Sequence, residues 1–175
     1  AHGIYTNKAS VAVKQSLFIA TKRQGHAMKV KGSKLTINQS IVVSLSADDS
    51  RLLDMPNGGE LHIKRSLLAQ GPKSVNGQVI GYGLEGMTKQ KNSINLSENV
   101  MYLERLGANY MLTTPKDIQL SSLIQKNNII IGNDNSSYKT ADNTYFVDRS
   151  ELGLPPYPKL PKAYCQAWSH CPIKQ

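Results

Sequence analysis

Short segments in which apolar and polar residues alternate recur along the chain, separated by turn residues. A period of two places every second side chain on the same face of an extended strand. Turn residues such as Pro56-Asn57-Gly58-Gly59 stand between the segments. The apolar or alternating stretches cover residues 41–45, 61–64, 78–80, 94–96, 100–103, 110–114, 118–120, 128–131 and 144–147. Many short strands of this kind predict a mainly β fold, a single-domain jelly roll or sandwich.

The clearest alternation lies in residues 28–37, where two short strands flank Gly32-Ser33. A two-residue turn at this place predicts a β-hairpin, in which Val30 faces Leu35 and Met28 faces Ile37. One face of this hairpin is apolar and the other is basic. The apolar residues are Met28, Val30, Leu35 and Ile37, and the basic ones are Lys29, Lys31 and Lys34.

Two segments depart from this pattern. Residues 8–24 fit a short N-terminal amphipathic helix, with Val13, Leu17 and Ala20 on one stripe, but they fit a strand equally well, and the sequence leaves both open. From Leu152 onward the chain is rich in proline and predicts an extended tail. We therefore expect a β-rich domain over residues 1–151 and a Pro-rich tail over 152–175.

The two cysteines, Cys165 and Cys171, both lie in this tail, on either side of Trp168. A disulfide between them would close a small loop and would indicate an oxidising compartment. Free thiols are the alternative. A metal site is less favoured, because Cys165, His170 and Cys171 match no common zinc spacing.

The charge is strongly positive, with 21 Lys and Arg against 12 Asp and Glu, a formal net charge of +9. This excess favours an anionic partner such as a phosphorylated lipid, an anionic membrane surface or nucleic acid, although a basic face can also serve solubility alone. Nucleic acid is the weaker candidate, because the basic N-terminal third offers only Tyr5 and Phe18 for stacking on bases. No apolar run approaches the roughly 18 residues of a membrane span.

Motifs for catalysis are absent or lack their context. Residues 81–86 match the spacing G-x-G-x-x-G, but no helix pattern follows, so we expect these glycines to serve a bend in β structure rather than a dinucleotide. His26 or His62, with Lys29 or Lys64, could act in a metal-independent ribonuclease. We expect no cofactor and no metal, and we favour a protein that is not an enzyme.

Three stretches resemble the periplasmic lipopolysaccharide-transport proteins of the LptC and LptA (OstA-like) type. They are residues 92–100 with the following Tyr102-Leu103, Gly107 and 110–114, residues 24–35, and residues 57–64. The resemblance spans residues 16–147. It implies a twisted β-jelly roll, a non-catalytic lipid relay, and pairing with other envelope proteins through strand edges.

On this resemblance, inward apolar residues would contact acyl chains and lysines near a mouth would contact lipid phosphates. Ordinary core packing is the alternative for the apolar set. The candidate ligand-binding residues are Met28, Val30, Leu35, Ile37, Leu61, Ile63, Leu96, Met111, Ile129, Lys29, Lys31, Lys34 and Lys64.

The sequence thus favours an exported, periplasmic or otherwise extracytoplasmic protein that binds or relays an anionic amphiphile such as lipopolysaccharide. Ala1 is not preceded here by the charged and apolar regions of a signal peptide, so we expect any export signal or anchor to lie outside this sequence. Two alternatives stay open. One is a secreted basic ribonuclease or toxin domain that uses His26 or His62, and the other is an extracellular fibre or pilus subunit.

Overall fold

Every strand pair is parallel in residues 1–156, the part of the chain that the computed structural model describes. The strands form three sheets, which we call A, B and C. Sheet A contains β1 (Ile4–Thr6), β4 (Met28–Val30), β7 (Leu53–Met55), β10 (Gln78–Tyr82) and β13 (Tyr110–Thr113). Sheet B contains β2 (Val11–Lys14), β5 (Lys34–Asn38), β8 (Glu60–Lys64), β11 (Ser93–Ser97) and β14 (Ser122–Lys126). Sheet C contains β3 (Leu17–Ile19), β6 (Ile41–Val43), β9 (Leu67–Gln70), β12 (Val100–Leu103), β15 (Ile129–Ile131) and β16 (Thr144–Phe146).

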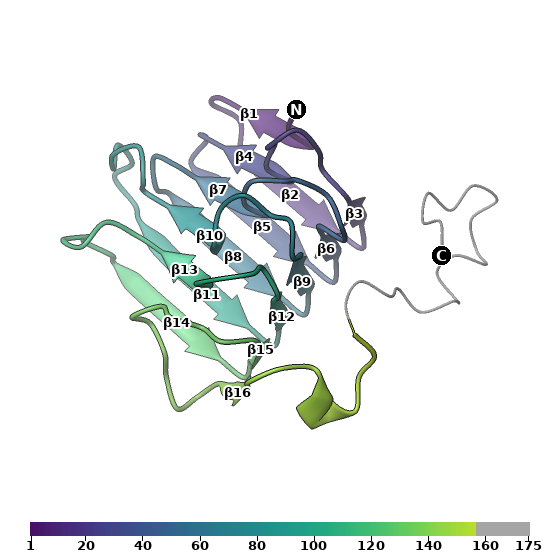
Figure 1. The fold of residues 1–175 in the computed structure, drawn as a ribbon. Helices are drawn as coiled ribbons and strands as arrows, with labels where there is room; N and C mark the ends of the chain where they lie inside the picture. The colour runs from purple at the N-terminus through teal and green to yellow at the C-terminus, as the bar shows by residue number, and fades with distance from the viewer. Residues whose placement is uncertain (157–175) are drawn as a thin grey trace.

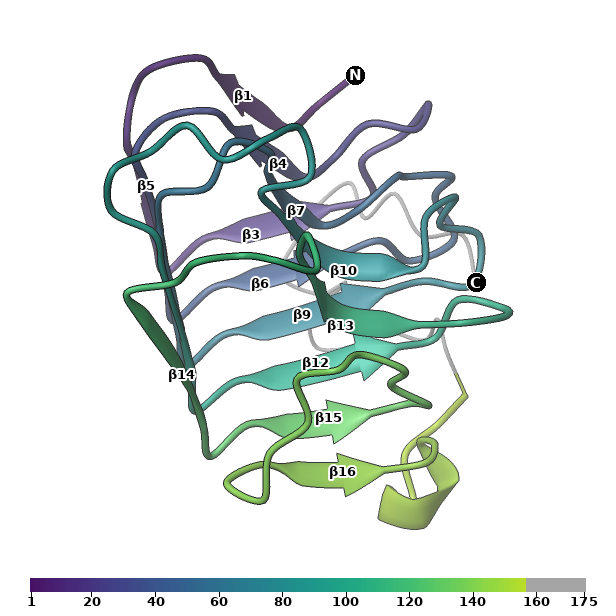
Figure 2. The same cartoon turned by 90° about the vertical axis from the view of Figure 1, so that its left-hand side faces the viewer.

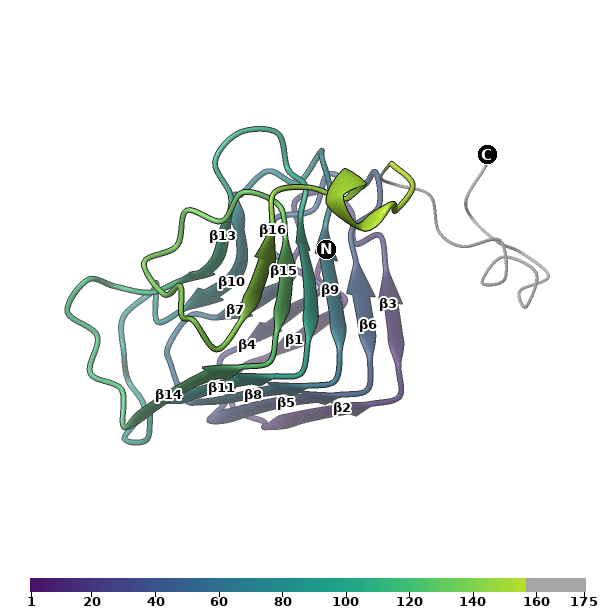
Figure 3. The same ribbon diagram turned by 90° about the horizontal axis from the view of Figure 1, so that it is seen from below.

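The chain visits the three sheets in the order A, B, C and then begins the next coil, so almost every strand pairs with the strand three positions later. Figure 1 shows the coils stacked along one axis, and Figure 2 shows the strands of sheet C lying one below another. Seen from below, the sheets form separate sides of each coil, with sheets B and C meeting at a sharp corner (Figure 3). This arrangement is a parallel β-helix of five full coils, followed by β16 and the short 3-10 helix η1 (Ser150–Leu152).

The interior is a stack of apolar side chains in register from coil to coil. In sheet B, Leu35, Leu61 and Ile94 are mutually aligned, and each is fully buried. In sheet C the corresponding inward residues are Val42, Leu68, Met101 and Ile130, also fully buried. Because the period of a strand is two, one residue in two is enough to fill this core.

The corner between sheets B and C has the same backbone geometry in five successive coils. One residue there adopts a positive φ between 48° and 57° in every coil: Gln15, Gln39, Arg65, Glu98 and Asn127. None of these residues is glycine, so each carries the steric cost of the left-handed conformation. This conformation makes a tight turn, which leads each strand of sheet B directly into a strand of sheet C.

A ladder of polar side chains follows these residues inside the corner. It comprises Ser16, Ser40, Ser66, Asn99, Asn128 and Asn143. In each step the backbone N–H of one member donates to the side-chain oxygen of the next, at 3.0 to 3.2 Å. Asn99 and Asn128 also donate to the carbonyls of Ile63 and Leu96. The ladder therefore satisfies backbone groups that the turn would otherwise bury without partners.

The fold confirms a mainly β chain and corrects several finer predictions. The jelly roll is not confirmed, since jelly rolls are antiparallel architectures and every pair here is parallel. The hairpin at residues 28–37 is wrong, because β4 pairs with β1 and β7 whereas β5 pairs with β2 and β8. Residues 8–24 contain strands β2 and β3 rather than a helix.

The glycine-rich stretch 81–86 ends β10 and begins the loop to β11. Gly83 and Gly86 have positive φ values of 72° and 98°, and Gly86 N–H donates to the Gly83 carbonyl. This is a bend in β structure, as the sequence predicted, and β11 rather than a helix follows it.

Two further predictions concern the Pro-rich tail with its two cysteines and the absence of a membrane-spanning segment. Cys165, Cys171 and most of the predicted tail lie outside the described residues. Within residues 1–156, no helix has the length and apolar character needed to cross a bilayer.

Candidate functional site

Most of the apolar residues predicted to contact a ligand form part of the core. The fully buried ones are Met28, Val30, Leu35, Ile37, Leu61, Ile63, Leu96 and Met111, which all belong to one cluster. Ile129 does not belong to it: its neighbour Ile130 takes the inward position, and Ile129 is 37% exposed on the outside of sheet C. The inward assignment of Ile129 is therefore wrong, because three successive isoleucines carry no alternation from which to assign a face.

The four predicted lysines do not gather around one opening. Lys29 and Lys31 follow the outer side of sheet A, and both form ion pairs with Glu85. Lys34 and Lys64 stand at opposite ends of neighbouring strands of sheet B. Lys64 is paired with Glu98 at 3.0 Å.

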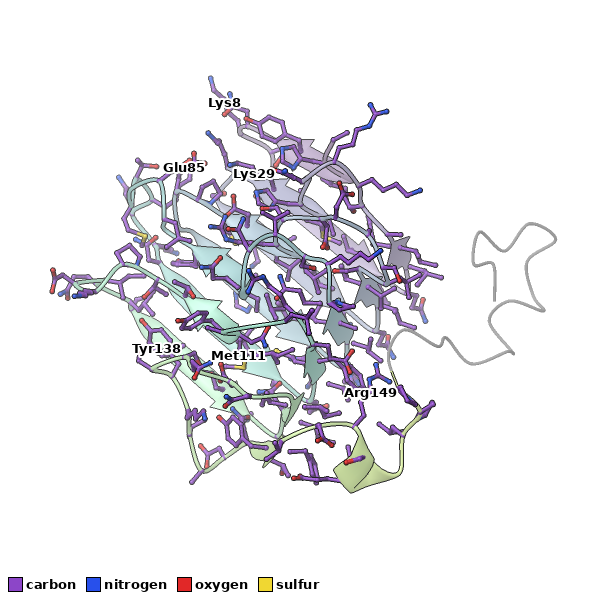
Figure 4. All side chains as sticks on the ribbon, in the orientation of Figure 1. Lys8, Lys29, Glu85, Met111, Tyr138 and Arg149 are labelled. Atoms are coloured by element: carbon purple, nitrogen blue, oxygen red, sulfur yellow. The ribbon has the colours of Figure 1, made fainter. Side chains whose placement is uncertain are left out.

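His26 belongs to a buried ionic cluster on the outer side of sheet A. Its Nε2 lies 3.5 Å from Asp54 Oδ2, and Lys29 Nζ lies 3.2 Å from the same oxygen. Arg51 N–H donates to His26 Nδ1, and the ring of His2 stacks on that of His26. Figure 4 shows Lys29 beside Glu85, which covers this cluster on one side.

Burial and hydrogen bonding set the pKa values of His26 and Lys29 in this cluster. It lowers the pKa of His26 to about 4, although Asp54 acts in the opposite direction. Burial also works to lower the pKa of Lys29, but hydrogen bonds with Glu85 and Asp54 outweigh it, and the pKa is raised. His26 and Asp54 are 7% and 2% exposed. We interpret the cluster as a structural network, because its acid and base groups are closed to a substrate.

His62 lies elsewhere, on the outer face of sheet B beside Glu60. The structure therefore does not bring the two predicted histidines together. The stacked pair is His2 with His26, and in both rings Nδ1 accepts a backbone N–H.

The outer side of sheet C, which we call the apolar face, was not predicted from the sequence. Two rows of outward side chains run across its strands. The first row is Leu17, Ile41, Leu67, Val100 and Ile129 and ends at Thr144 on β16, and the second is Ile19, Val43, Ala69, Tyr102, Ile131 and Phe146. Both rows are apolar apart from Thr144 and the hydroxyl of Tyr102, so from β3 to β15 this sheet is apolar on its inner and its outer side.

The first row of the apolar face is open to solvent. Leu17, Ile41, Leu67 and Val100 are partly exposed, and Ile129 is exposed. The second row is more covered: Val43, Ala69 and Ile131 are buried. Val43 and Ala69 form a small second cluster with Leu45, against which Ile19, Ile41 and Leu67 pack. The face is thus a shallow apolar platform rather than part of the interior.

Basic side chains gather at the corner where sheet B leads into sheet C. This basic corner comprises Lys14, Lys64 and Lys126, the last residues of β2, β8 and β14, together with Arg65 in the turn that precedes β9, and all four are exposed. Glu98 is the acidic residue of the same corner and pairs with Lys64. Within residues 1–156, Lys14, Arg65 and Lys126 have no acidic partner within ion-pairing distance.

Comparisons with known proteins add no family to this description. No family model matches the chain, and neither the curated proteins nor the solved structures contain a match.

Two sequence signals could have revealed the apolar face. Strands covered on both sides read as continuous apolar runs, and Leu17-Phe18-Ile19, Ile41-Val42-Val43 and Ile129-Ile130-Ile131 are runs of this kind. The second signal is the Ser or Asn before each run, which recurs at intervals of 24, 26, 33 and 29 residues. Loops of unequal length, above all residues 83–92, hide this repeat.

Proposed function

We propose that the protein is an exported, non-enzymatic binding module that holds an anionic amphiphile on the apolar face, with the anionic headgroup at the basic corner. One observation carries this proposal: a row of partly exposed apolar side chains runs next to the basic corner, where Lys14, Arg65 and Lys126 have no acidic partner among residues 1–156. The apolar core of the β-helix is not required to open, so the ligand binds outside the coil rather than inside it.

The apolar row supplies the affinity. A continuous apolar patch on a soluble protein marks an interaction surface more often than scattered apolar residues do. The first row crosses the five strands from β3 to β15, so four strand intervals of about 4.8 Å make it about 19 Å long. Each methylene of an acyl chain fully buried on it would contribute about 0.8 kcal/mol, and because a single chain gives only marginal binding, the apolar row and the basic corner have to act together.

The basic corner supplies the charge selectivity. Ammonium and guanidinium groups form strong hydrogen bonds with phosphate, and Arg65 can do so in a bidentate manner. The corner places Arg65 next to Ser66 and Leu67, so a headgroup bound there lies at the start of the apolar row. An amphiphile with phosphate near the acyl chains fits both rows at once.

Lipopolysaccharide is the amphiphile that we put forward first. It joins phosphorylated sugars to several acyl chains, and the resemblance of residues 24–35 and 92–100 to lipopolysaccharide-transport proteins supports the same choice. That resemblance also supports a place in the periplasm or elsewhere outside the cytoplasm.

Calorimetric titration with dispersed lipopolysaccharide tests the proposal. We expect Ile41→Asp and Arg65→Glu each to weaken binding at least about tenfold, which corresponds to about 1.4 kcal/mol. The matched controls are Thr36→Asp, on the outer face of sheet B in the same coil as Ile41, and Lys8→Glu, in the turn between β1 and β2.

The controls separate the binding surface from general effects. Lys8→Glu changes the net charge as much as Arg65→Glu does, and Thr36→Asp places the same side chain on the same coil as Ile41→Asp. If the controls weaken binding as strongly as the variants of the apolar face and basic corner, or if the protein binds no lipopolysaccharide, the proposal is wrong.

A further inference from the structure

The last described residues of the chain are attached to the apolar face. After β16 the chain turns to the outer side of sheet C, where the guanidinium of Arg149 lies 4.3 Å from the centre of the Tyr102 ring. Arg149 also forms an ion pair with Glu104, and both side chains are largely buried. Figures 3 and 4 show η1 and Arg149 on this side of the molecule.

Hydrogen bonds hold the following residues at this point. Gly153 and Leu154 N–H groups donate to the carbonyls of Ser150 and Arg149, which closes the chain around η1. Arg149 then donates to the carbonyl of Pro155 at 3.3 Å. The exit of the chain is therefore fixed next to Tyr102, a member of the second row of the apolar face.

The remaining 19 residues, 157–175, have the length and the composition to cover the apolar face. At about 3.1 Å per residue, about eight residues of a proline-rich segment span the roughly 24 Å from β16 to β3. The segment carries five large side chains with apolar surface, Tyr157, Leu160, Tyr164, Trp168 and Ile173. It contains no Asp or Glu, so it would bring no carboxylate onto the apolar platform.

We propose that residues 157–175 dock on the apolar face and compete there with the amphiphile. A segment tethered at the edge of its own binding surface acts at an effective concentration in the millimolar range, so even weak contacts would keep it bound. The docking follows from the fixed exit and the exposed apolar row. The competition rests in addition on the proposed function.

Trp168 is the single tryptophan of the chain and reports the docking directly. In the full-length protein without amphiphile, we expect its fluorescence to be protected from acrylamide. Ile41→Asp on the apolar face and Leu160→Asp in the segment should each shift its emission to longer wavelength and raise the quenching constant at least twofold. Thr36→Asp on sheet B should change neither quantity.

The variant in the segment also separates the two proposals. Leu160→Asp leaves all residues of the β-helix unchanged, so a fold defect cannot explain its effect. If neither Leu160→Asp nor Ile41→Asp changes the quenching of Trp168, docking of the segment is refuted, whatever the lipopolysaccharide titration shows.

The calorimetric titration with lipopolysaccharide measures whether the segment competes with the amphiphile. If the segment competes, Leu160→Asp should tighten binding of lipopolysaccharide at least threefold relative to the unaltered protein. If Leu160→Asp exposes Trp168 and leaves the affinity unchanged, the competition is refuted and the docking stands. If no variant binds lipopolysaccharide although Trp168 responds, the proposed function fails and the docking again stands.

Discussion

Sheets B and C share a corner, a coil geometry and a core, but their outer faces differ completely. In the three central strands of sheet B, β5, β8 and β11, each apolar inward residue alternates with a polar outward one, as in Leu35-Thr36-Ile37 and Leu61-His62-Ile63. In sheet C the outward residues are as apolar as the inward ones. Since inward residues alone build the core, the outward row of sheet C is free to serve binding.

The difference between the two sides of one strand can be measured in β9. Leu68 points inward and is fully buried, whereas Leu67 points outward and is partly exposed. We expect Leu68→Ala to lower the free energy of unfolding by about 2 to 5 kcal/mol, through lost burial and a cavity. Leu67→Ala should cost less than about 1 kcal/mol. Urea unfolding of both variants gives the comparison, and equal losses would mean that the two faces are not distinct.

Sequence patterns predicted the sheet B half of this comparison and missed the other half. Leu35, Ile37, Leu61 and Ile63 were predicted as inward residues, and they are. The runs of sheet C contain no polar residue to mark a face, and Ile129 was assigned to the wrong side.

The stacking of coils was also not predicted from the sequence. Gly32-Ser33 has the residue types of a hairpin turn, but β4 before it belongs to sheet A and β5 after it belongs to sheet B. Pairing with the neighbouring coils satisfies more backbone groups than pairing within one hairpin does. Strand pairing over 24 to 33 residues leaves no local signal except the ladder of Ser and Asn.

The ladder of Ser and Asn side chains stabilises the corner between sheets B and C, and Asn99 makes several of its hydrogen bonds. It accepts from Ser66 N–H and donates to the Ile63 carbonyl and to Asn128. Asn99→Ala removes the buried acceptor of Ser66 N–H and the side-chain donor to the Ile63 carbonyl, and we expect a loss of about 2 to 3 kcal/mol. Asn95→Ala, on the outer face of sheet B, is the control and should cost well under 1 kcal/mol. A loss for Asn99→Ala no larger than that of the control would show that the ladder does not stabilise the corner.

The ionic cluster on sheet A predicts a pH dependence. The pKa of His26 is lowered from its model-peptide value of 6.5 to about 4 in the folded protein. Between these values the unfolded chain binds more protons, so stability falls as the pH drops from 6.5 towards 4. The loss should be of the order of 2 kcal/mol. Unfolding midpoints of the wild type and His26→Gln across this range should converge at low pH, and parallel curves would contradict this role for burial.

The smallest expected effect concerns the backbone of the corner. Arg65 has φ 49°, and Asn127 occupies the equivalent position two coils later with φ 56°. Asparagine tolerates this conformation better than arginine does. Arg65→Asn should therefore raise the unfolding free energy by a few tenths of a kcal/mol and at the same time weaken binding of lipopolysaccharide. Thermal unfolding and titration of the same sample measure both, and a loss of stability would contradict the shared corner geometry.

Methyl NMR with an amphiphile that carries a spin label on its acyl chain tests the central claim most directly. The account predicts that the methyl signals of Ile41, Leu67 and Ile129 broaden on titration, while those of Ile124 and Ala12 on the outer face of sheet B do not. Broadening that is equal on both sheets, or that appears first at the buried Leu35 and Leu61, would contradict binding on the apolar face.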